Sequence, residues 1–349
     1  MSRQTDSSIT LKAAKKMMEF PALRRLDHLI WSLIAAVAAI VLASPSVSNF
    51  FIEWKTFAAP VLAAAMLAGM AWFYHRWRPD PRLAAGLEST SQMIAFIAVG
   101  APLSYLAAST NLPLQDHLFD TVDRALGLDW RGMLNWINGL PVVYEAMRPI
   151  YLSLTLQIVT ALLCLAFTGR LLGLRIFILS FILAALVSIA ISALLPAAGV
   201  WPYYALTATD SPHLTPVAST SWSVFYGLRD GSFRALTAIG SEGIISFPSL
   251  HAALALILII VIWPIPLLRW LILALNVAML ASTPIEGSHY FSDVLAGLGV
   301  AALCLFAARK IAARVEHMNM DSRVRTQWIN HVRAAAKRMA ERKISARLS

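Results

Sequence analysis

Two short segments of the chain place histidine and aspartate at spacings that suit nucleophilic and acid–base chemistry. The first reads Ser-Phe-Pro-Ser-Leu-His and ends at His251. The second reads Gly-Ser-His-Tyr-Phe-Ser-Asp and contains His289 and Asp293. Residues four apart share one face of a helix, so the Asp293 carboxylate can accept a hydrogen bond from the His289 imidazole. Such a bond fixes which ring nitrogen is free, as a nucleophilic or general-base histidine requires.

An arginine adds a candidate phosphate ligand. Arg148 is followed by Pro149 at the start of another apolar segment. The planar guanidinium donates two parallel hydrogen bonds to a tetrahedral phosphate. Two histidines, a carboxylate and an arginine together indicate phosphoryl or phosphodiester transfer, provided that the fold brings them together.

The composition indicates that membrane helices position these residues. Hydrophobic residues make up 58% of the 349 residues and charged residues only 14%, against roughly 25% charged in soluble proteins. A helix needs about 20 apolar residues to cross the hydrocarbon. We predict an all-α polytopic membrane bundle of about eight transmembrane helices, at residues 28–45, 57–75, 92–109, 142–168, 173–196, 250–263, 265–283 and 289–308.

Basic residues predict the orientation of these helices. Lys and Arg near helix ends favour the cytoplasmic side. They occur in both termini and in every second connection, namely at Arg76, Arg78, Arg82, Arg170, Arg175 and Arg269. We therefore expect cytoplasmic N- and C-termini. His251, His289 and Arg148 are then expected at the outer face, which is periplasmic, extracellular or lumenal.

This topology divides the chain into four parts. They are a basic cytoplasmic N-terminus (1–27), three N-terminal transmembrane helices (28–109), a core (110–308) and a basic tail (309–349). The core contains two outer loops, 110–141 and 197–249, whose Trp and Tyr residues suit the headgroup zone. The tail holds eleven Lys and Arg against three Asp and Glu. We expect it to be a solvated helix, with a surface helix on anionic lipid as the alternative.

These residues resemble the type 2 phosphatidic acid phosphatase superfamily, whose motifs read K-x6-R-P, P-S-G-H and S-R-x5-H-x3-D. Arg148-Pro149 matches the end of the first motif, and 248–251 matches the second with Leu for Gly. Ser282, His289 and Asp293 match the third. The resemblance covers about residues 110–308.

Two departures refine the resemblance. Pro141 stands where the first motif has Lys, and Thr283 stands where the third has Arg. The second motif as Phe-Pro-Ser-Leu-His-Ala, together with His-Tyr-Phe-x-Asp, is more similar to the inositol phosphorylceramide synthase (inositolphosphotransferase) branch. That branch transfers a phosphoalcohol headgroup between lipids. A diester carries one charge less than a monoester, which fits the loss of two cationic ligands.

The resemblance implies roles for the site residues. His289 attacks phosphorus and forms a phosphohistidine, Asp293 orients it, and His251 protonates the leaving alkoxide and then deprotonates the acceptor. No cofactor or metal is required. The candidate substrate-binding residues are Arg148, Ser249, Ser282, Arg229 and Arg234, the last two as replacements for the missing cations.

Alternative functions remain at this point. A lipid phosphate phosphatase would use water in place of an alcohol acceptor. A metal-binding transport protein could use His251, His289 and Asp293 as two histidines and one carboxylate. Partners are expected to be the bilayer, a lipid phosphate or phosphodiester donor and an alcohol acceptor, with no nucleic acid. The oligomeric state stays open, and Cys164 and Cys304 suggest neither a disulfide nor a zinc site.

Overall fold

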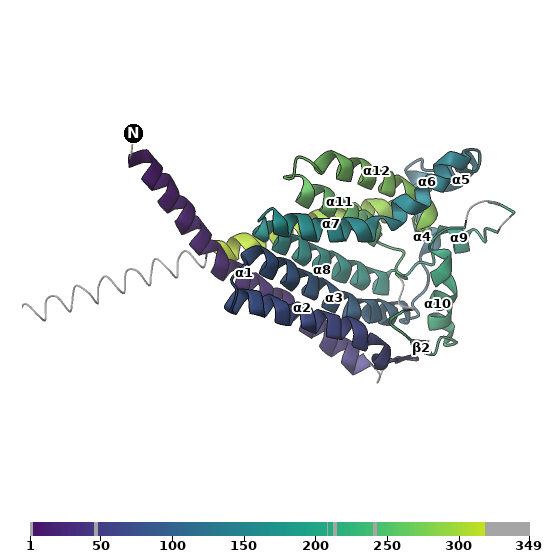
Figure 1. Ribbon diagram of the computed structural model, residues 1–349. Helices are drawn as coiled ribbons and strands as arrows, with labels where there is room; N and C mark the ends of the chain where they lie inside the picture. Colours follow the sequence, from purple (N-terminus) through teal and green to yellow (C-terminus); the bar gives the residue numbers. More distant parts are fainter. Residues whose placement is uncertain (1–2, 45–47, 208, 212–214, 240–242, 318–349) are drawn as a thin grey trace, which may run out of the picture. The chain divides into compact units, whose positions relative to one another are not determined.

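The computed structural model describes residues 3–44, 48–207, 209–211, 215–239 and 243–317, with side chains described from Leu23 onward (Figure 1). The chain divides into two compact units. One is Ile30–Ala308, and the other is formed by Met1–Leu29 with Arg309–Ser349. The candidate site lies in Ile30–Ala308. Most of the predicted basic tail, residues 318–349, lies outside the described residues.

Helices make up nearly all of the described structure. The first part of the chain forms α1 (Arg3–Ala43), the short η2 (Trp54–Phe57), α2 (Ala58–Arg76) and α3 (Pro81–Ala108). The helix α3 begins eleven residues before the predicted span, because Asp80 accepts hydrogen bonds from the amides of Arg82 and Leu83. Proline at the first helical position suits this start, since its missing N–H has no partner there anyway.

The remaining part of the chain forms short helices between long ones. In chain order these are α4 (Asp116–Ala125), α5 (Trp130–Asn138), α6 (Pro141–Leu152), α7 (Leu154–Phe167), α8 (Leu171–Leu194), α9 (Val200–Tyr203), α10 (Ser219–Asp230), α11 (Leu250–Ile262) and α12 (Arg269–Glu286). A last helix runs over Phe291–His317. The mostly helical fold that the sequence predicts is confirmed.

The number of membrane crossings is supported only in part. Among the described residues, five helices are long and apolar enough to cross a membrane, and α6 with α7 makes a sixth if the bent pair counts as one span. The helices α11 and α12 coincide with the two other predicted spans but do not meet that test. Eight crossings therefore stay a prediction.

The predicted span 142–168 is broken rather than continuous. The helices α6 and α7 meet at Ser153 with a bend of 45°. Pro149 lies inside α6, and a proline there removes one helical hydrogen bond and pushes against the carbonyl four residues earlier. We attribute the bend to this residue. Arg148 and Tyr151 lie on the α6 side of the bend.

The shortest predicted span, α11, is sheltered by its neighbours. Its 13 residues extend only about 20 Å at 1.5 Å per residue, less than the roughly 30 Å of bilayer hydrocarbon. It starts at Leu250 because Ser249 caps it, its Oγ accepting from the Ala252 amide at 3.4 Å. The helix packs against α12, α8 and α7, and most of its residues are buried.

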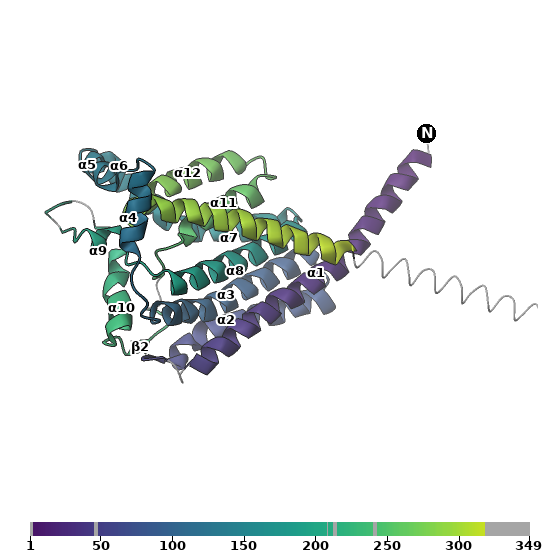
Figure 2. The same cartoon turned by 180° about the vertical axis from the view of Figure 1, so that it is seen from behind.

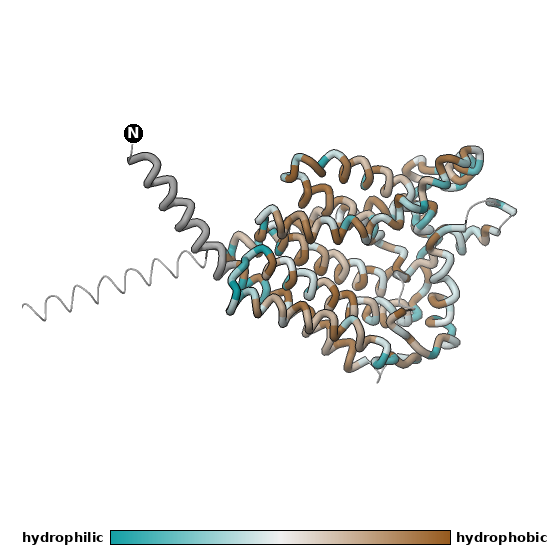
Figure 3. Tube along the Cα trace, in the orientation of Figure 1, coloured by the Kyte–Doolittle hydropathy of each residue, from teal (hydrophilic) through white to brown (hydrophobic). Residues whose placement is uncertain are grey.

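Apolar side chains cover the outward faces of the long helices. Large exposed hydrophobic residues include Leu62, Met66, Leu156, Leu163 and Leu303. In Figure 3 the apolar residues fill the middle of the bundle and most polar residues lie toward its two ends. An exposed apolar surface of this extent suits lipid rather than water, and these helices support an integral membrane protein.

One basic residue of the predicted inner connections lies elsewhere than expected. Arg175 is inside α8 and only 1% exposed. Its Nη1 donates to the Ala85 carbonyl and the Ser89 hydroxyl of α3, at 3.0 Å each. Arg175 therefore does not count among the loop charges that predict the orientation of the helices, because its guanidinium connects α8 to α3.

The two predicted outer loops gather at one end of the bundle. Figures 1 and 2 show α4, α5, α9 and α10 at the end where α6 and α11 begin. A parallel pair of two-residue strands, β1 (Phe51–Ile52) and β2 (Ala235–Leu236), ties the connection between α1 and α2 to the long loop 197–249. The loops thus form a cap over this end. The side of the membrane on which the cap lies is not determined.

Candidate active site

His289 and Asp293 form a buried pair at the start of the last helix. His289 is 3% exposed and Asp293 is fully buried. The His289 Nδ1 lies 3.1 Å from Asp293 Oδ2, which also accepts from the Ser246 hydroxyl at 3.2 Å and the Tyr290 amide at 3.0 Å. A carboxylate only accepts, so this network assigns the proton of His289 to Nδ1. Nε2 is then left with its lone pair.

The environment of His289 favours the neutral ring. Burial lowers the pKa of His289 to about 4, against the opposing effect of a hydrogen bond to the Ser246 backbone. A charged imidazole loses more hydration than a neutral one when it is buried. At neutral pH the ring is therefore neutral and keeps one nitrogen without a proton, as a nucleophile requires.

His251 lies in the first turn of α11 and is bonded to Tyr151. Its Nδ1 is 3.1 Å from the Tyr151 hydroxyl, and the two rings stack with centroids 4.1 Å apart and planes inclined by 15°. The two imidazoles are close enough for a charge on one to disfavour a charge on the other. The structure thus brings both histidine motifs together.

Two glycines allow this convergence. A Cβ at Gly297 would lie 2.3 Å from the Ser249 carbonyl oxygen, so only glycine lets the last helix approach the start of α11. The Ser249 amide donates to the Asp293 carbonyl at 3.1 Å across this contact. A Cβ at Gly287 would lie 2.5 Å from His289 Cδ2 and 2.8 Å from the Tyr151 hydroxyl. Gly287 therefore lies between the His289 ring and the Tyr151 hydroxyl that is bonded to His251.

Arg148 lies at the edge of this site, beside a buried carboxylate. It is exposed, and its Nη1 donates to the Thr215 carbonyl at 3.4 Å. Glu286, at the end of α12, is 2% exposed, interacts electrostatically with Arg148 and accepts from the Val217 amide at 3.1 Å. The segment 215–218 is thereby fastened over this edge. The burial of Glu286 could not be read from the sequence.

Ser249 and Ser282 use their polar groups within the protein. The Ser249 hydroxyl caps α11, and its amide is bonded to the Asp293 carbonyl. The Ser282 hydroxyl donates to the Met279 carbonyl at 2.9 Å, and Thr283 donates to the same carbonyl at 2.7 Å. Both α12 residues are fully buried. The phosphate contacts of Ser249 and Ser282 stay predictions, and the Ser249 amide is already bonded within the protein.

Arg229 and Arg234 are not brought to the histidines. Arg229, on α10, donates to the Leu112 carbonyl at 2.6 Å and lies over the Phe225 ring. Arg234 is exposed, and its carbonyl accepts from the Phe51 amide beside the strand pair. Within the described part of the chain, no interaction links either arginine to His251 or His289. Their role as phosphate ligands stays a prediction without support from this geometry.

Two aspartates of α4 hold the segment around His289, and sequence reasoning missed them. The Asp123 carboxylate accepts from the Phe291 and Ser292 amides at 2.7 and 2.8 Å. Asp116 accepts from the Tyr290 hydroxyl at 3.0 Å. Burial raises the pKa of both carboxyls, and these hydrogen bonds oppose the rise. Their seven-residue spacing, which places both on one helix face, is the signal that could have revealed them.

Asp116 also fastens the loop before α9. It accepts from the Ala198 and Gly199 amides at 3.0 and 2.9 Å. Gly199 has φ of 97°, and a Cβ there would lie 2.5 Å from the Ser288 carbonyl oxygen. The residue before His289 therefore packs directly against the long loop, which stiffens the support of the imidazole.

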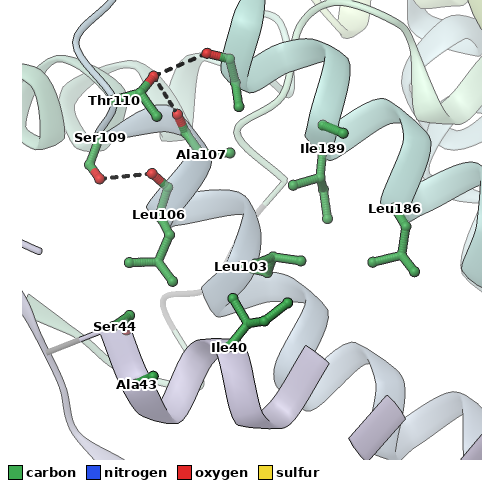
Figure 4. A pocket seen from close by; sticks show the side chains of 12 residues that line it. Ile40, Ala43, Ser44, Leu103, Leu106, Ala107, Ser109, Thr110, Leu186 and Ile189 are labelled. Atoms are coloured by element: carbon green, nitrogen blue, oxygen red, sulfur yellow. Dashed lines mark hydrogen bonds between the residues drawn. The ribbon is translucent and has the colours of Figure 1, made fainter. Parts of the chain in front are cut away.

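A separate pocket lies between α1, α3 and α8 (Figure 4). Its volume is about 850 Å³, and its lining is mostly apolar. The hydroxyls at its rim are bonded to helix carbonyls, Ser109 to Leu106 and Thr110 to Ala107 and Ala193. None of the candidate site residues lines it.

The described residues do not assemble a metal site. No group of three or more His, Cys, Asp or Glu side chains in that part of the chain is placed to hold an ion. The Nδ1 atoms of His289 and His251 are bonded to Asp293 and Tyr151. The geometry gives the metal-binding alternative no support.

The fold is a bundle of apolar helices that suit a membrane, and the site brings together two histidines, one of which is paired with a carboxylate. These features define the class as a membrane protein with a histidine-based site. A family model described as the PAP2 superfamily matches residues 118–307, which is more than half of the chain. The chain belongs to the PAP2 superfamily, and the superfamily resemblance is confirmed. Members are generally phosphatases or phosphotransferases, so the match supports an enzyme that acts on lipid phosphates in a membrane. No curated protein and no solved structure matches the chain.

Proposed function

We propose that this protein transfers a phosphoryl or phosphoalcohol group from a lipid phosphate ester to an alcohol acceptor through a phosphohistidine at His289. The buried His289–Asp293 pair, with Nδ1 and Oδ2 3.1 Å apart, carries the proposal. It leaves Nε2 free for attack in a site that excludes much of the water. The branch similar to inositol phosphorylceramide synthase is the proposed specialisation.

The reaction proceeds in two displacements. His289 Nε2 bonds to phosphorus while the lipid alkoxide leaves and takes a proton from His251. His251 then takes the proton of the acceptor hydroxyl, whose oxygen attacks phosphorus and releases His289. Asp293 stabilises the positive charge that His289 carries after the first displacement.

Arg148 is the proposed ligand for the phosphate oxygens. Its bond to the Thr215 carbonyl is long, at 3.4 Å, and the side chain is exposed. A phosphate oxygen is a stronger acceptor for a guanidinium than a carbonyl, so an incoming phosphate can displace Thr215. This exchange would also release one contact of the segment 215–218.

Two observations favour transfer of a diester headgroup. Pro141, at the start of α6, and Thr283, which is bonded to its own helix, are uncharged. Neither position therefore supplies the cation that the motifs have there. Fewer cations suit a phosphodiester, which carries less charge than a monoester. The exposure of Arg148 favours the second candidate, a lipid phosphate phosphatase, because water can reach this edge of the site.

Purified protein distinguishes the two reactions. It would be given phosphatidylinositol or phosphatidic acid, each labelled with ³²P, together with ceramide or diacylglycerol as the acceptor. The proposal predicts a labelled acceptor lipid. Labelled inorganic phosphate from phosphatidic acid, or labelled inositol phosphate from phosphatidylinositol, without a labelled acceptor lipid would favour the phosphatase. His289→Ala should abolish turnover, and the exposed His117→Ala on α4 is the matched control. Failure of the wild-type protein to consume either donor would refute both reactions.

A further inference from the structure

The two histidines of the site have partners of different chemistry. His289 Nδ1 is bonded to the Asp293 carboxylate, and His251 Nδ1 is bonded to the Tyr151 hydroxyl. A carboxylate can only accept a hydrogen bond, whereas a hydroxyl can either donate or accept. His289 is therefore held with its proton on Nδ1, but the partner of His251 tolerates Nδ1 both with and without a proton.

We infer that Tyr151 is the positioning residue that lets His251 alternate between acid and base. With His251 charged, its Nδ1–H donates to the Tyr151 oxygen. After His251 has given up its Nε2 proton, Nδ1 keeps its own proton and still donates to the Tyr151 oxygen. The ring keeps its place in both states, and Nε2 remains the nitrogen that exchanges protons with the substrate. The inference rests on the proposed two-step transfer and extends it to a residue outside the three motifs.

The protons balance over one cycle. In the first displacement the Nε2–H bond of charged His251 breaks and an O–H bond forms on the leaving alcohol. The ring is then neutral, with its remaining proton on Nδ1 toward the Tyr151 oxygen and a lone pair on Nε2 that can act as the base. In the second displacement the acceptor hydroxyl returns one proton to the ring. Tyr151 itself gains and loses none.

The packing of Tyr151 suits this task. It is 6% exposed, and its ring lies 15° from parallel with the imidazole. It follows Pro149 by two residues, just before the bend between α6 and α7. Gly287 leaves room for its hydroxyl next to His289. Tyr151 thus reaches from the end of α6 to the first turn of α11.

Two phosphate esters test the inference. The probes are dodecyl phosphate, whose alkoxide needs a proton to leave, and p-nitrophenyl phosphate, whose phenolate does not. Tyr151→Phe keeps the ring but removes the hydroxyl. We compare kcat/KM, which reports the steps up to phosphorylation of the enzyme, for wild type, Tyr151→Phe and the control Tyr226→Phe on α10.

The expected result is a selective defect. Tyr151→Phe should lower kcat/KM for dodecyl phosphate by about ten- to a hundred-fold, which is part of the roughly 10²- to 10⁴-fold that general acid catalysis contributes. For p-nitrophenyl phosphate, whose leaving group needs no proton, the loss should be less than about threefold. Equal losses on both esters, or no loss on the alkyl ester, would overturn the role of Tyr151 while leaving the proposed function in place. A wild-type protein that cleaves neither ester would overturn the proposed function as well. Monodisperse elution of the variant separates these outcomes from misfolding.

Discussion

Asp123 and Asp293 together satisfy the first amides of the last helix. Asp123, from α4, accepts from the amides of Phe291 and Ser292, and Asp293 accepts from the amide of Tyr290. The first amides of a helix have no partner within it, so carboxylates there are stabilising. The same carboxylate of Asp293 holds His289, which couples the loop helix α4 to the nucleophile.

Asp123→Ala should therefore impair both stability and turnover. It leaves two partly buried amides without their acceptor, which we expect to cost about 1–3 kcal/mol in the free energy of unfolding. Activity per folded molecule should fall as well, because the start of the last helix can then move. Thermal unfolding and kcat measured on the same preparation would show both effects.

Asp129→Ala is the control for this variant. Asp129 caps α5 by accepting from the Gly132 amide, without contacting the histidines. Its loss should cost about 1 kcal/mol and leave kcat nearly unchanged. If Asp123→Ala kept normal kcat per folded molecule, the coupling of α4 to His289 would be wrong.

Gly287→Ala should inactivate the protein through crowding. The added methyl would lie 2.5 Å from His289 Cδ2 and 2.8 Å from the Thr283 carbonyl oxygen, so the imidazole must move. Overpacking of this kind costs about 1–3 kcal/mol. Gly299→Ala on the last helix is the matched control, since a Cβ there meets nothing within 4 Å. Similar kcat values for the two variants would contradict the close approach at Gly287.

The pH dependence of kcat/KM should reflect the lowered pKa of His289. The nucleophile is active when neutral, so activity is lost as the pH falls through its pKa. Burial lowers that pKa from 6.5 to about 4, and the acid limb should accordingly lie near pH 4. Phosphatidylinositol is the suitable substrate, because a diester does not titrate in this range. An acid limb near pH 6.5 would show that His289 titrates as an exposed histidine does.

The features that could be predicted from the sequence are those that depend on the pattern of neighbouring residues. Apolar segments of sufficient length predicted the long helices. The four-residue spacing predicted the His289–Asp293 pair, although His289 lies just before the last helix and does not share a helix face with Asp293. The Asp-Pro pair at 80–81 carried the signal for the early start of α3. The meeting of the second and third motifs followed from their order in the topology, and the structure brings them together.

Contacts between distant segments could not be predicted in this way. Tyr151 and His251 are 100 residues apart, and Asp123 and Phe291 are 168 apart. Such pairs depend on the bend after Pro149 and on how α4 lies over the bundle, which no periodicity encodes. The burial of Arg175 has the same origin, since a charge beside a loop and a charge between two helices look alike in the sequence.

The most direct test of the account is to trap the phosphorylated enzyme. Wild-type protein mixed with ³²P-labelled phosphatidic acid and ³²P-labelled phosphatidylinositol in separate reactions would be denatured within milliseconds and digested. A phosphohistidine at His289 should give a label that is stable in alkali, labile in acid and located on the peptide that contains His289. The label should be absent from His289→Ala. A label on any other residue, or rapid turnover with no labelled protein at any time, would contradict it.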